Sequence, residues 1–314
     1  MRFAAALAAA ATLFAAAPVV LGAARPSAAG PRIGGCPVFP ASDPWNRDVS
    51  RDPVDPRSAD YLRSIGDGVR VHPDFGSGRY GNYGIPITVT SSKTAARGVR
   101  FTDYGDESDK GPYPIPANVP IEGQPSTSND GDRHALIVDR DTCKLYELYA
   151  LERTGSTWTA GSGAIFDLSS NKVRPAGWTS ADAAGLPIFP GLARWDGDAS
   201  TGAIRHALRF TVERTRKAYV YPARHYASSS TDPSLPPMGL RVRLKASVDI
   251  SHLPRQARIV AQAMKTYGMI LADNGSNWYV SGAPSPKWSN DQLHALGALH
   301  GSDFEVVDTS SLHP

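Results

Sequence analysis

The stretch RHALIVDRDTCKLYELY, residues 133–149, decides the expected fold. It holds two runs rich in branched, aliphatic and aromatic residues, separated by the turn-forming letters RDT. Such a pair of runs around a short polar turn is typical of a β-hairpin. The letters RHAL return at 205–208, within a segment that alternates apolar and polar side chains up to Val212. We interpret both RHAL runs as starts of strands, because the echo is too short to indicate an internal duplication.

The remainder of the chain extends this mainly-β pattern. Turn-rich segments with strand-like alternation continue to residue 248, and apolar residues at helical spacing then mark 253–268 and a shorter segment near 290. We predict a mainly-β fold, an antiparallel β-sandwich or barrel-like domain with one or two C-terminal helices packed outside it. An extended N-terminal arm over 30–60 is expected to precede a single domain over 61–314.

Two finer predictions concern the C-terminal half. The runs MILADNG and NWYVSG are predicted to pair as a hairpin through Asn274-Gly275. In GLRVRLKASV, alternation turns the aliphatic residues inward and leaves Arg241, Arg243 and Lys245 outward. This basic ladder could hold an anionic sugar, and an ordinary solvated strand surface explains it as well.

The N-terminus has the features of a secretion signal. Arg2 precedes an apolar run rich in alanine, and Ser27-Ala28-Ala29 supplies a small-residue cleavage site. An uncleaved membrane anchor is the alternative, but alanine is a weak membrane residue and Pro18 interrupts the run. We predict a signal peptide over 1–29 and a secreted, extracellular protein that does not stay with the membrane.

Cysteine content and charge narrow the class of protein further. Cys36 and Cys143 are the two cysteines, and an even count in an exported chain predicts a disulfide. A net charge of +3 is too small for electrostatic binding of nucleic acid. The chain has no G-x-S-x-G, H-E-x-x-H, P-loop or dinucleotide motif, so no cofactor is expected. The acidic runs at 129–134 and 138–142 offer oxygen ligands for Ca²⁺ but lack the EF-hand order.

Histidines are the first candidates for chemistry. His134 and His206 fall on the apolar faces of their predicted strands, where a core histidine with a backbone partner is the ordinary interpretation. His206 is the stronger candidate for a site, because the following strand-like segment presents His225, with Tyr221 and Arg224 beside it.

Carboxylates are the second candidates, since glycoside hydrolysis ordinarily uses two of them. Asp182 and Asp273 stand near Trp178 and Trp278 in the sequence, and aromatic rings such as these and Tyr279 stack on sugars. The alternative is that both aspartates only stabilise turns, which is the ordinary place for this residue type.

Several long motifs carry a resemblance. CPVFPASDPWNRDVS, GDRHALIVDRDTCKLYELY, GWTSADAAGLPIFPGL and HYASSSTDPSLPPMGLRVRLK together resemble a widespread family of secreted bacterial proteins. The resemblance covers nearly all of the chain after the signal and implies export and a single-unit domain. It implies no catalytic residue.

We therefore expect a secreted carbohydrate-active protein, a glycoside hydrolase or polysaccharide lyase acting on an extracellular polysaccharide as a monomer. Asp182 and Asp273 are the predicted acid/base or nucleophile pair, and His206 and His225 are the proton-relay candidates. The predicted sugar-binding residues are Trp178, Trp278, Tyr279, Tyr221 and Arg224. A non-catalytic carbohydrate- or surface-binding protein, or a structural envelope protein, remains the alternative.

Overall fold

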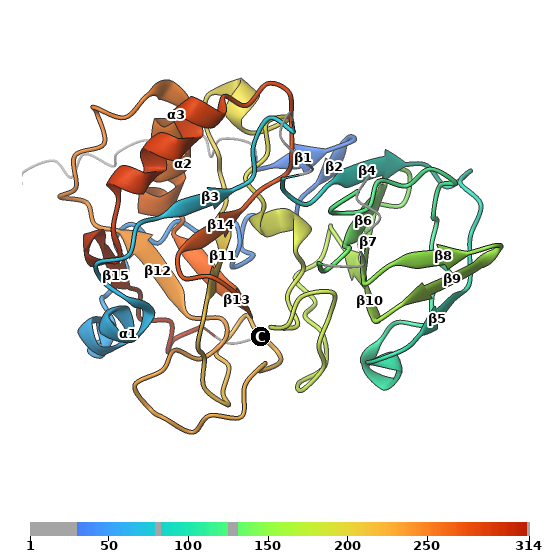
Figure 1. Ribbon diagram of the computed structural model, residues 1–314, viewed down its shortest axis with the longest axis horizontal. Helices are drawn as coiled ribbons and strands as arrows, with labels where there is room; N and C mark the ends of the chain where they lie inside the picture. Colours follow the sequence, from blue (N-terminus) through green and yellow to red (C-terminus); the bar gives the residue numbers. More distant parts are fainter. Residues whose placement is uncertain (1–29, 79–82, 125–130, 313–314) are drawn as a thin grey trace, which may run out of the picture.

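The computed structural model describes residues 30–78, 83–124 and 131–312, and the predicted signal peptide lies outside them. The described chain forms open β-sheets with helices outside them (Figure 1). The predicted mainly-β, sandwich-like class is therefore confirmed, and no sheet of the described ranges closes into a barrel. Within the same ranges, no helix is both long enough and apolar enough to cross a membrane.

The largest sheet has six strands in the order β15-β12-β13-β11-β14-β3. Most neighbours are antiparallel, but β11 runs parallel to β13 and β14 runs parallel to β3. The strands are β3 (His72–Asp74), β11 (Leu208–Val212), β12 (Arg241–Leu244), β13 (Met269–Asn274), β14 (Tyr279–Ser281) and β15 (Phe304–Val306).

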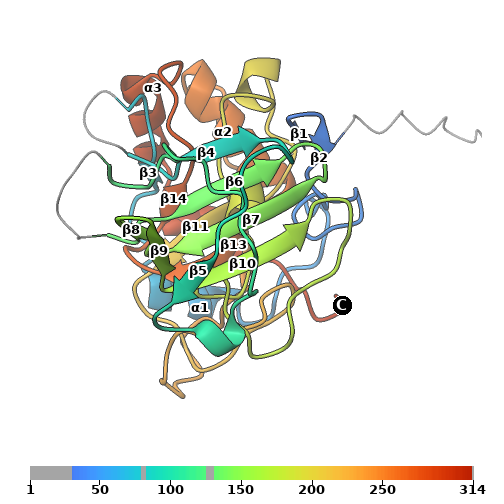
Figure 2. The same ribbon diagram turned by 90° about the vertical axis from the view of Figure 1, so that its right-hand side faces the viewer.

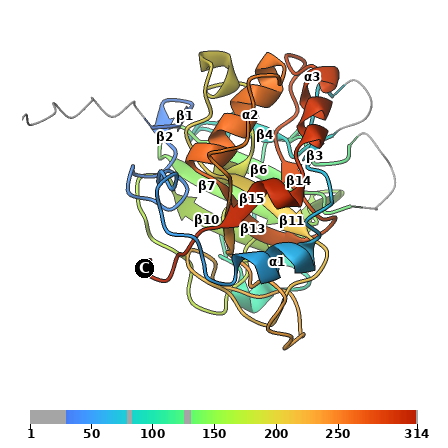
Figure 3. The ribbon, with the colours of Figure 1, turned by 90° about the vertical axis from the view of Figure 1, so that its left-hand side faces the viewer.

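Helices cover the side of this sheet that faces away from the rest of the molecule (Figure 3). The predicted helix over 253–268 forms as α2, with Ala257, Val260, Ala261 and Met264 buried along one face. The α-helices are α1 (Ser58–Ile65), α2 (Arg255–Thr266) and α3 (Asn290–His294). Short 3-10 turns are η1 (Gly105–Glu107), η2 (Phe189–Gly191), η3 (Ala199–Thr201), η4 (Ala295–Ala298) and η5 (Gly301–Asp303).

A four-stranded sheet, in the order β10-β7-β6-β4, lies beside the first and carries a three-stranded sheet, β5-β9-β8, on its outer side (Figure 2). One of its two inner strands, β6, is buried at every residue. Leu136 and Val138 join the main core, whereas Ala135 and Ile137 pack in the smaller core under the three-stranded sheet. The strands are β4 (Ile87–Thr90), β5 (Val99–Phe101), β6 (Ala135–Asp139), β7 (Lys144–Tyr149), β8 (Glu152–Thr154), β9 (Thr157–Ala160) and β10 (Ser162–Asp167).

The two predicted hairpins have different outcomes. β6 and β7 pair antiparallel around residues 140–143, as the sequence predicts. The hairpin through Asn274-Gly275 is wrong, because β11 lies between β13 and β14 and pairs with both of them. β11, which precedes β13 by some sixty residues in the chain, thus occupies the position beside β13 that the turn residues predict for β14.

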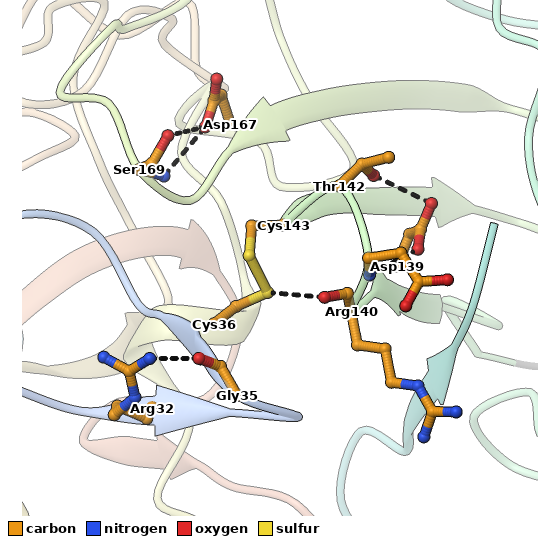
Figure 4. Close-up of a disulfide and its surroundings, with 10 residues drawn as sticks. Arg32, Gly35, Cys36, Asp139, Arg140, Thr142, Cys143, Asp167 and Ser169 are labelled. Atoms are coloured by element: carbon orange, nitrogen blue, oxygen red, sulfur yellow. Dashed lines mark hydrogen bonds between the residues drawn. A yellow bond between two sulfur atoms is a disulfide. The ribbon is translucent and has the colours of Figure 1, made fainter.

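The predicted disulfide joins Cys36 to Cys143 across a sequence separation of 107 residues. Cys36 belongs to a small hairpin of β1 (Arg32–Ile33) and β2 (Cys36–Pro37), and Cys143 ends the turn before β7 (Figure 4). The bridge therefore fastens the start of the described chain to the four-stranded sheet.

The basic ladder on β12 is not a solvated surface. Arg241 and Arg243 are buried, so the predicted outward orientation toward solvent or an anionic sugar is wrong for both. Arg241 donates to the carbonyl oxygens of Pro44 and Arg47, and Arg243 donates to those of Val49 and Asp52. The segment before α1 covers this side of the sheet, which strand alternation alone does not reveal.

Candidate functional site

A polar pocket of about 460 Å³ opens where the ends of β7 and β13 approach each other. Residues from several distant parts of the chain border it, since two sheets and two long loops meet there. The lining consists of Tyr104, Asp132, Tyr149, Ser162, Thr179, Ser180, Ala181, Asp182, Ala183, Lys217, His225, Tyr226, Ala227, Ser228, Ser229, Asp273 and Asn274.

Arg209 joins the two predicted carboxylates. Its Nε and Nη2 donate to the two carboxylate oxygens of Asp182 at 2.9 and 3.1 Å, and Nη2 also lies 3.3 Å from Asp273 Oδ2. Nη1 donates to Ser281 Oγ at 2.7 Å. Burial alone would lower the pKa of Arg209, but the Asp182 carboxylate raises it above its ordinary value. The two aspartates predicted from the sequence therefore lie close together, and the residue that joins them, Arg209, was not predicted.

The two aspartates differ in access to the pocket. The side chain of Asp182 is fully buried and held by both of its oxygens, so it is not free to act as a nucleophile. That part of its predicted role is wrong. The side chain of Asp273 is 22% exposed. Burial and the charge of Asp182 raise the pKa of Asp273 to about 7, against the lowering effect of Arg209. Asp273 is thereby kept largely protonated in weakly acidic solution.

A second ion pair lies beside the first. His134 Nδ1 is 2.5 Å from Glu122 Oε2, and His134 Nε2 is 3.0 Å from the carbonyl oxygen of Ala181 in the pocket wall. Burial opposes the charge of His134, but Glu122 raises its pKa to about 9. His134 is therefore an imidazolium that holds Ala181 in place. Its burial and its bond to a backbone carbonyl agree with the prediction of a core histidine with a backbone partner.

A buried glutamate shapes the loop below the pocket. Glu147 on β7 accepts hydrogen bonds from the backbone N–H groups of Ile188 and Phe189 at 2.8 to 3.0 Å. Burial raises the pKa of Glu147 to about 7, although these donors lower it. The carboxyl anchors the turn that follows Asp182, and so it sets the position of the inner wall.

His225 and its neighbours form the opposite wall. His225 Nδ1 lies 2.9 Å from the carbonyl oxygen of Ala183. Because a carbonyl only accepts, Nδ1 is the donor in this hydrogen bond. The ring stacks on Tyr226 at 5.3 Å between centroids, and Lys217 Nζ lies 5.6 Å from the same tyrosine ring.

Other predicted residues lie outside the pocket lining. His206 is fully buried, with its ring nitrogens 3.1 Å from Asp198 Oδ2 and 2.8 Å from the carbonyl oxygen of Ala207. Trp278 is also fully buried, where it stacks on Phe210 and Phe304. The catalytic role of His206 and the sugar-stacking role of Trp278 are therefore wrong, since neither ring reaches solvent.

The remaining predicted binding residues support the wall or lie at a distance from it. Arg224 Nε donates to the carbonyl oxygen of Arg174 at 2.9 Å, and the Arg174 guanidinium lies 5.6 Å from the Trp178 ring. Tyr221 is half-buried, and the charge of Arg224 acts on it. Tyr279 stands on β14, stacked on His72 at 4.2 Å between ring centroids. Arg224, Trp178, Tyr221 and Tyr279 border other parts of the surface than the pocket.

Sequence reasoning missed Arg209, Glu122 and Tyr104, and it named Asp132 only within the run 129–134 of possible Ca²⁺ ligands. Arg209 falls on the polar side of an alternating strand, which normally indicates solvent. Its one signal is its place between Leu208 and Phe210 in a strand that turns out to be covered on both faces. The three others stand in loops, where residue type alone carries no information about the site.

Chemically, the pocket offers a carboxyl that is protonated near neutrality, an ionisable carboxylate, an imidazole and several hydroxyl groups. Within the described residues, no group of three or more His, Cys, Asp or Glu side chains is arranged to hold a metal ion. Comparison of the chain with protein-family models, with curated proteins and with solved structures found no match in any of the three. The resemblance to secreted bacterial proteins stays a prediction.

Proposed function

We propose that the protein is a secreted carbohydrate-active enzyme, and more narrowly a glycoside hydrolase that cleaves an extracellular polysaccharide in this pocket. The observation that carries the proposal is that Asp273 and Asp132 both line this pocket, where the charge of Asp132 acts on Asp273. Glycoside hydrolysis needs one protonated and one ionised carboxyl group on either side of the scissile bond. The disulfide agrees with an oxidising compartment outside the cytoplasm.

In this proposal Asp273 is the general acid that protonates the glycosidic oxygen. Its raised pKa, about 7, suits a group that must hold a proton near neutral pH and release it during the reaction. Asp132 is the exposed carboxylate that activates water or attacks the anomeric carbon. Asp182 acts through its charge, because this charge helps to keep the proton on Asp273.

The remaining lining suits a sugar. Ser162, Thr179 and Ser180 are buried in the pocket wall, where their hydroxyl groups bond to backbone carbonyl oxygens. Ser229 is exposed on the lining and offers its hydroxyl group to a saccharide. Tyr104 is 45% exposed at the rim, so its ring is free to stack on the C–H face of a sugar. Tyr104 thus takes the role that the sequence gave to Trp278.

Charge favours hydrolysis over polysaccharide lysis. A lyase removes a proton next to a uronate carboxylate, and this carboxylate must meet positive charge. Among the described lining residues, Lys217 is the one lysine or arginine, and Asp132 is an exposed carboxylate. The charge of Asp182 is opposed by Arg209. An anionic substrate meets no surplus of positive charge there, so we propose a neutral or amino-sugar polymer.

The proposal is tested by incubating the purified mature protein with a panel of plant, fungal and bacterial polysaccharides. We expect new reducing ends from the wild type, and roughly 100-fold slower release from Asp273→Asn, as for loss of a general acid. Asp132→Asn should be slowed as well. Asp249→Asn is the matched control, since this exposed aspartate stands in an Asx turn with Ser251, away from the pocket lining.

Each alternative gives a different result in the same assay. Unsaturated products that absorb in the ultraviolet would replace hydrolysis with lysis and overturn the roles of both aspartates. Retention on an insoluble polysaccharide without products would indicate a binding protein. Full activity of Asp273→Asn would keep the enzyme and discard the proposed acid.

A further inference from the structure

A row of paired residues crosses the six-stranded sheet from Asp273 to its edge. Asp273 pairs with Thr211 on β11, Thr211 pairs with Tyr279 on β14, and Tyr279 pairs with His72 on β3. The register of β11 and β13 shifts between Phe210 and Thr211, so the side on which Asp273 lies follows from its contact with Arg209. Thr211, Tyr279 and His72 pair without such a shift, and directly paired residues project from the same face of a sheet. Figure 1 shows the four strands side by side in this order. We call these four residues the polar row.

The neighbouring register position confirms which face this is. Arg209 and Ser281 stand two residues from Thr211 and Tyr279, and their side chains meet at 2.7 Å on the side of Asp182. The intervening Phe210 and Val280 are fully buried in the main core. The polar row therefore belongs to the same side of the sheet as the carboxylates of the pocket.

The far end of the row is an aromatic cluster that reaches solvent. His72 stacks on Tyr279 with a centroid distance of 4.2 Å and an interplanar angle of 27°. His72 Nε2 lies 2.7 Å from the hydroxyl of Tyr83, and that hydroxyl also bonds with Asp74. Tyr83 is 43% exposed and Tyr279 is partly exposed. Rings held in place by hydrogen bonds and partly open to water are typical of a carbohydrate platform.

The spacing of the row sets the size of the ligand. Adjacent strands lie about 4.8 Å apart, so Tyr279 stands about 10 Å from Asp273 and His72 about 14 Å from it. A ligand that touches both ends must be longer than one sugar ring. A straight row across a sheet fits a flat, extended chain better than a coiled one.

We infer that His72, Tyr279 and Tyr83 form a second saccharide subsite, continuous with the pocket, for an extended β-1,4-linked neutral or N-acetylated polymer. This inference rests on the proposed function and specifies its substrate class. The reacting bond lies at Asp273, and the sugars on one side of it lie along the polar row. Tyr279 is then a substrate-binding residue, as the sequence suggested, but in a subsite outside the pocket.

The test measures affinity against chain length. Cello- and chito-oligosaccharides, from the disaccharide to the hexasaccharide, are titrated by calorimetry into Asp273→Asn protein, which leaves the ligands intact. We expect affinity to rise with length in one of the two series. When Tyr279→Ala is added to the Asp273→Asn protein, the affinity for the longest oligosaccharide should fall roughly tenfold. The affinity for the disaccharide should stay unchanged.

Two further variants separate stacking from a general loss of structure. Tyr279→Phe keeps the ring and should keep the gain with length. Tyr83→Phe removes the hydroxyl group that bonds to His72, and this variant should lose part of the gain in affinity with chain length. Thermal unfolding of each variant is recorded in parallel, and an unchanged disaccharide affinity shows that the pocket of a variant is still folded.

The outcomes distinguish the subsite from the proposed function. If the gain with length survives Tyr279→Ala, or if the parent protein shows no gain, the subsite is wrong and hydrolysis in the pocket is untouched. If the protein cleaves another polysaccharide of the panel and binds neither series, the inferred substrate class is wrong. If it cleaves and binds no polysaccharide, both the function and the inference fail.

Discussion

Arg209 on β11 and Arg241 on β12 lie on either side of β13, where both pair with Ile270. Both side chains are buried. Arg209 meets the carboxylates of Asp182 and Asp273, whereas Arg241 donates to carbonyl oxygens only. Burial lowers the pKa of Arg241 to about 9, with Arg47 adding to this effect, but the pKa of Arg209 is raised.

The difference teaches what a buried guanidinium does in this fold. Around Arg241, neutral acceptors of the segment 44–47 satisfy the donors, and the result is a clamp that holds this segment on the sheet. Around Arg209, carboxylate acceptors lie at the wall of an open pocket, and burial together with the charge of Asp182 keeps a proton on Asp273. The same side chain serves structure in one place and electrostatics in the other.

The largest expected effect breaks the charged cluster. Arg209→Met leaves Asp182 buried without its cation, which should lower the free energy of unfolding by about 3–5 kcal/mol. Urea denaturation at pH 7 measures this loss. The double variant Arg209→Met with Asp182→Asn should recover a large part of it, since no uncompensated charge remains. A double variant no more stable than the single one would contradict the ion-pair account.

A smaller effect is expected at the clamp. Arg241→Met removes donors from several carbonyl groups and a positive charge near the buried Asp43 carboxyl, which still accepts from the Trp45 N–H, so the loss should be about 2 kcal/mol. Limited proteolysis should then cut within residues 43–52 faster than it does in the wild type. Arg258→Met, on the exposed side of α2, is the matched control. If Arg241→Met lowered the free energy of unfolding as much as Arg209→Met does, the proposed difference between the two buried arginines would be wrong.

The smallest expected effect depends on pH. The native pKa of Asp273, about 7, lies above its ordinary value of 3.8, so the native state binds the proton more tightly. Its contribution to stability is therefore complete below about pH 4 and is lost as the pH rises through 7. Asp273→Asn removes this loss and should be more stable than the wild type by about 1–2 kcal/mol at pH 8, after allowance for solvent screening.

Thermal unfolding of both proteins at pH 5 and pH 8 measures this difference. The advantage of the variant should be small at pH 5 and grow toward pH 8. Glu147 titrates in the same range, but it is present in both proteins and cancels in the comparison. Asp249→Asn should show no gain at pH 8, because hydrogen bonds to Ser251 lower the pKa of this exposed carboxyl. An advantage that shrinks with rising pH would contradict the raised pKa.

Local chemistry made parts of the fold predictable. The β6–β7 hairpin and α2 follow from residues close together in the sequence, and both form where the pattern indicates. The disulfide follows from a count of two cysteines. Asp182 and Asp273 were nominated as a pair from residue type and nearby tryptophans, and both reach the same arginine.

Other parts were not predictable, because they depend on contacts between distant segments. β11 enters between β13 and β14, which replaces a hairpin that Asn274-Gly275 favours locally. Strand alternation assigned Arg209 and Arg241 to solvent, yet other segments of the chain cover both positions. Trp278 and His206 looked available for chemistry and are packed in the interior for the same reason.

The sequence by itself determined the mainly-β class, the positions of most strands, the C-terminal helices and the disulfide, since periodicity and turn residues act over short distances. Only the tertiary structure decided which face of each strand is covered and which charges share a pocket. The segments packed over a strand determine which of its side chains are buried. Burial in turn raises the pKa of Asp273 and determines which groups Arg209 and Arg241 contact. For this reason the candidate acid could be named from the sequence, but its protonation and its neighbours could not.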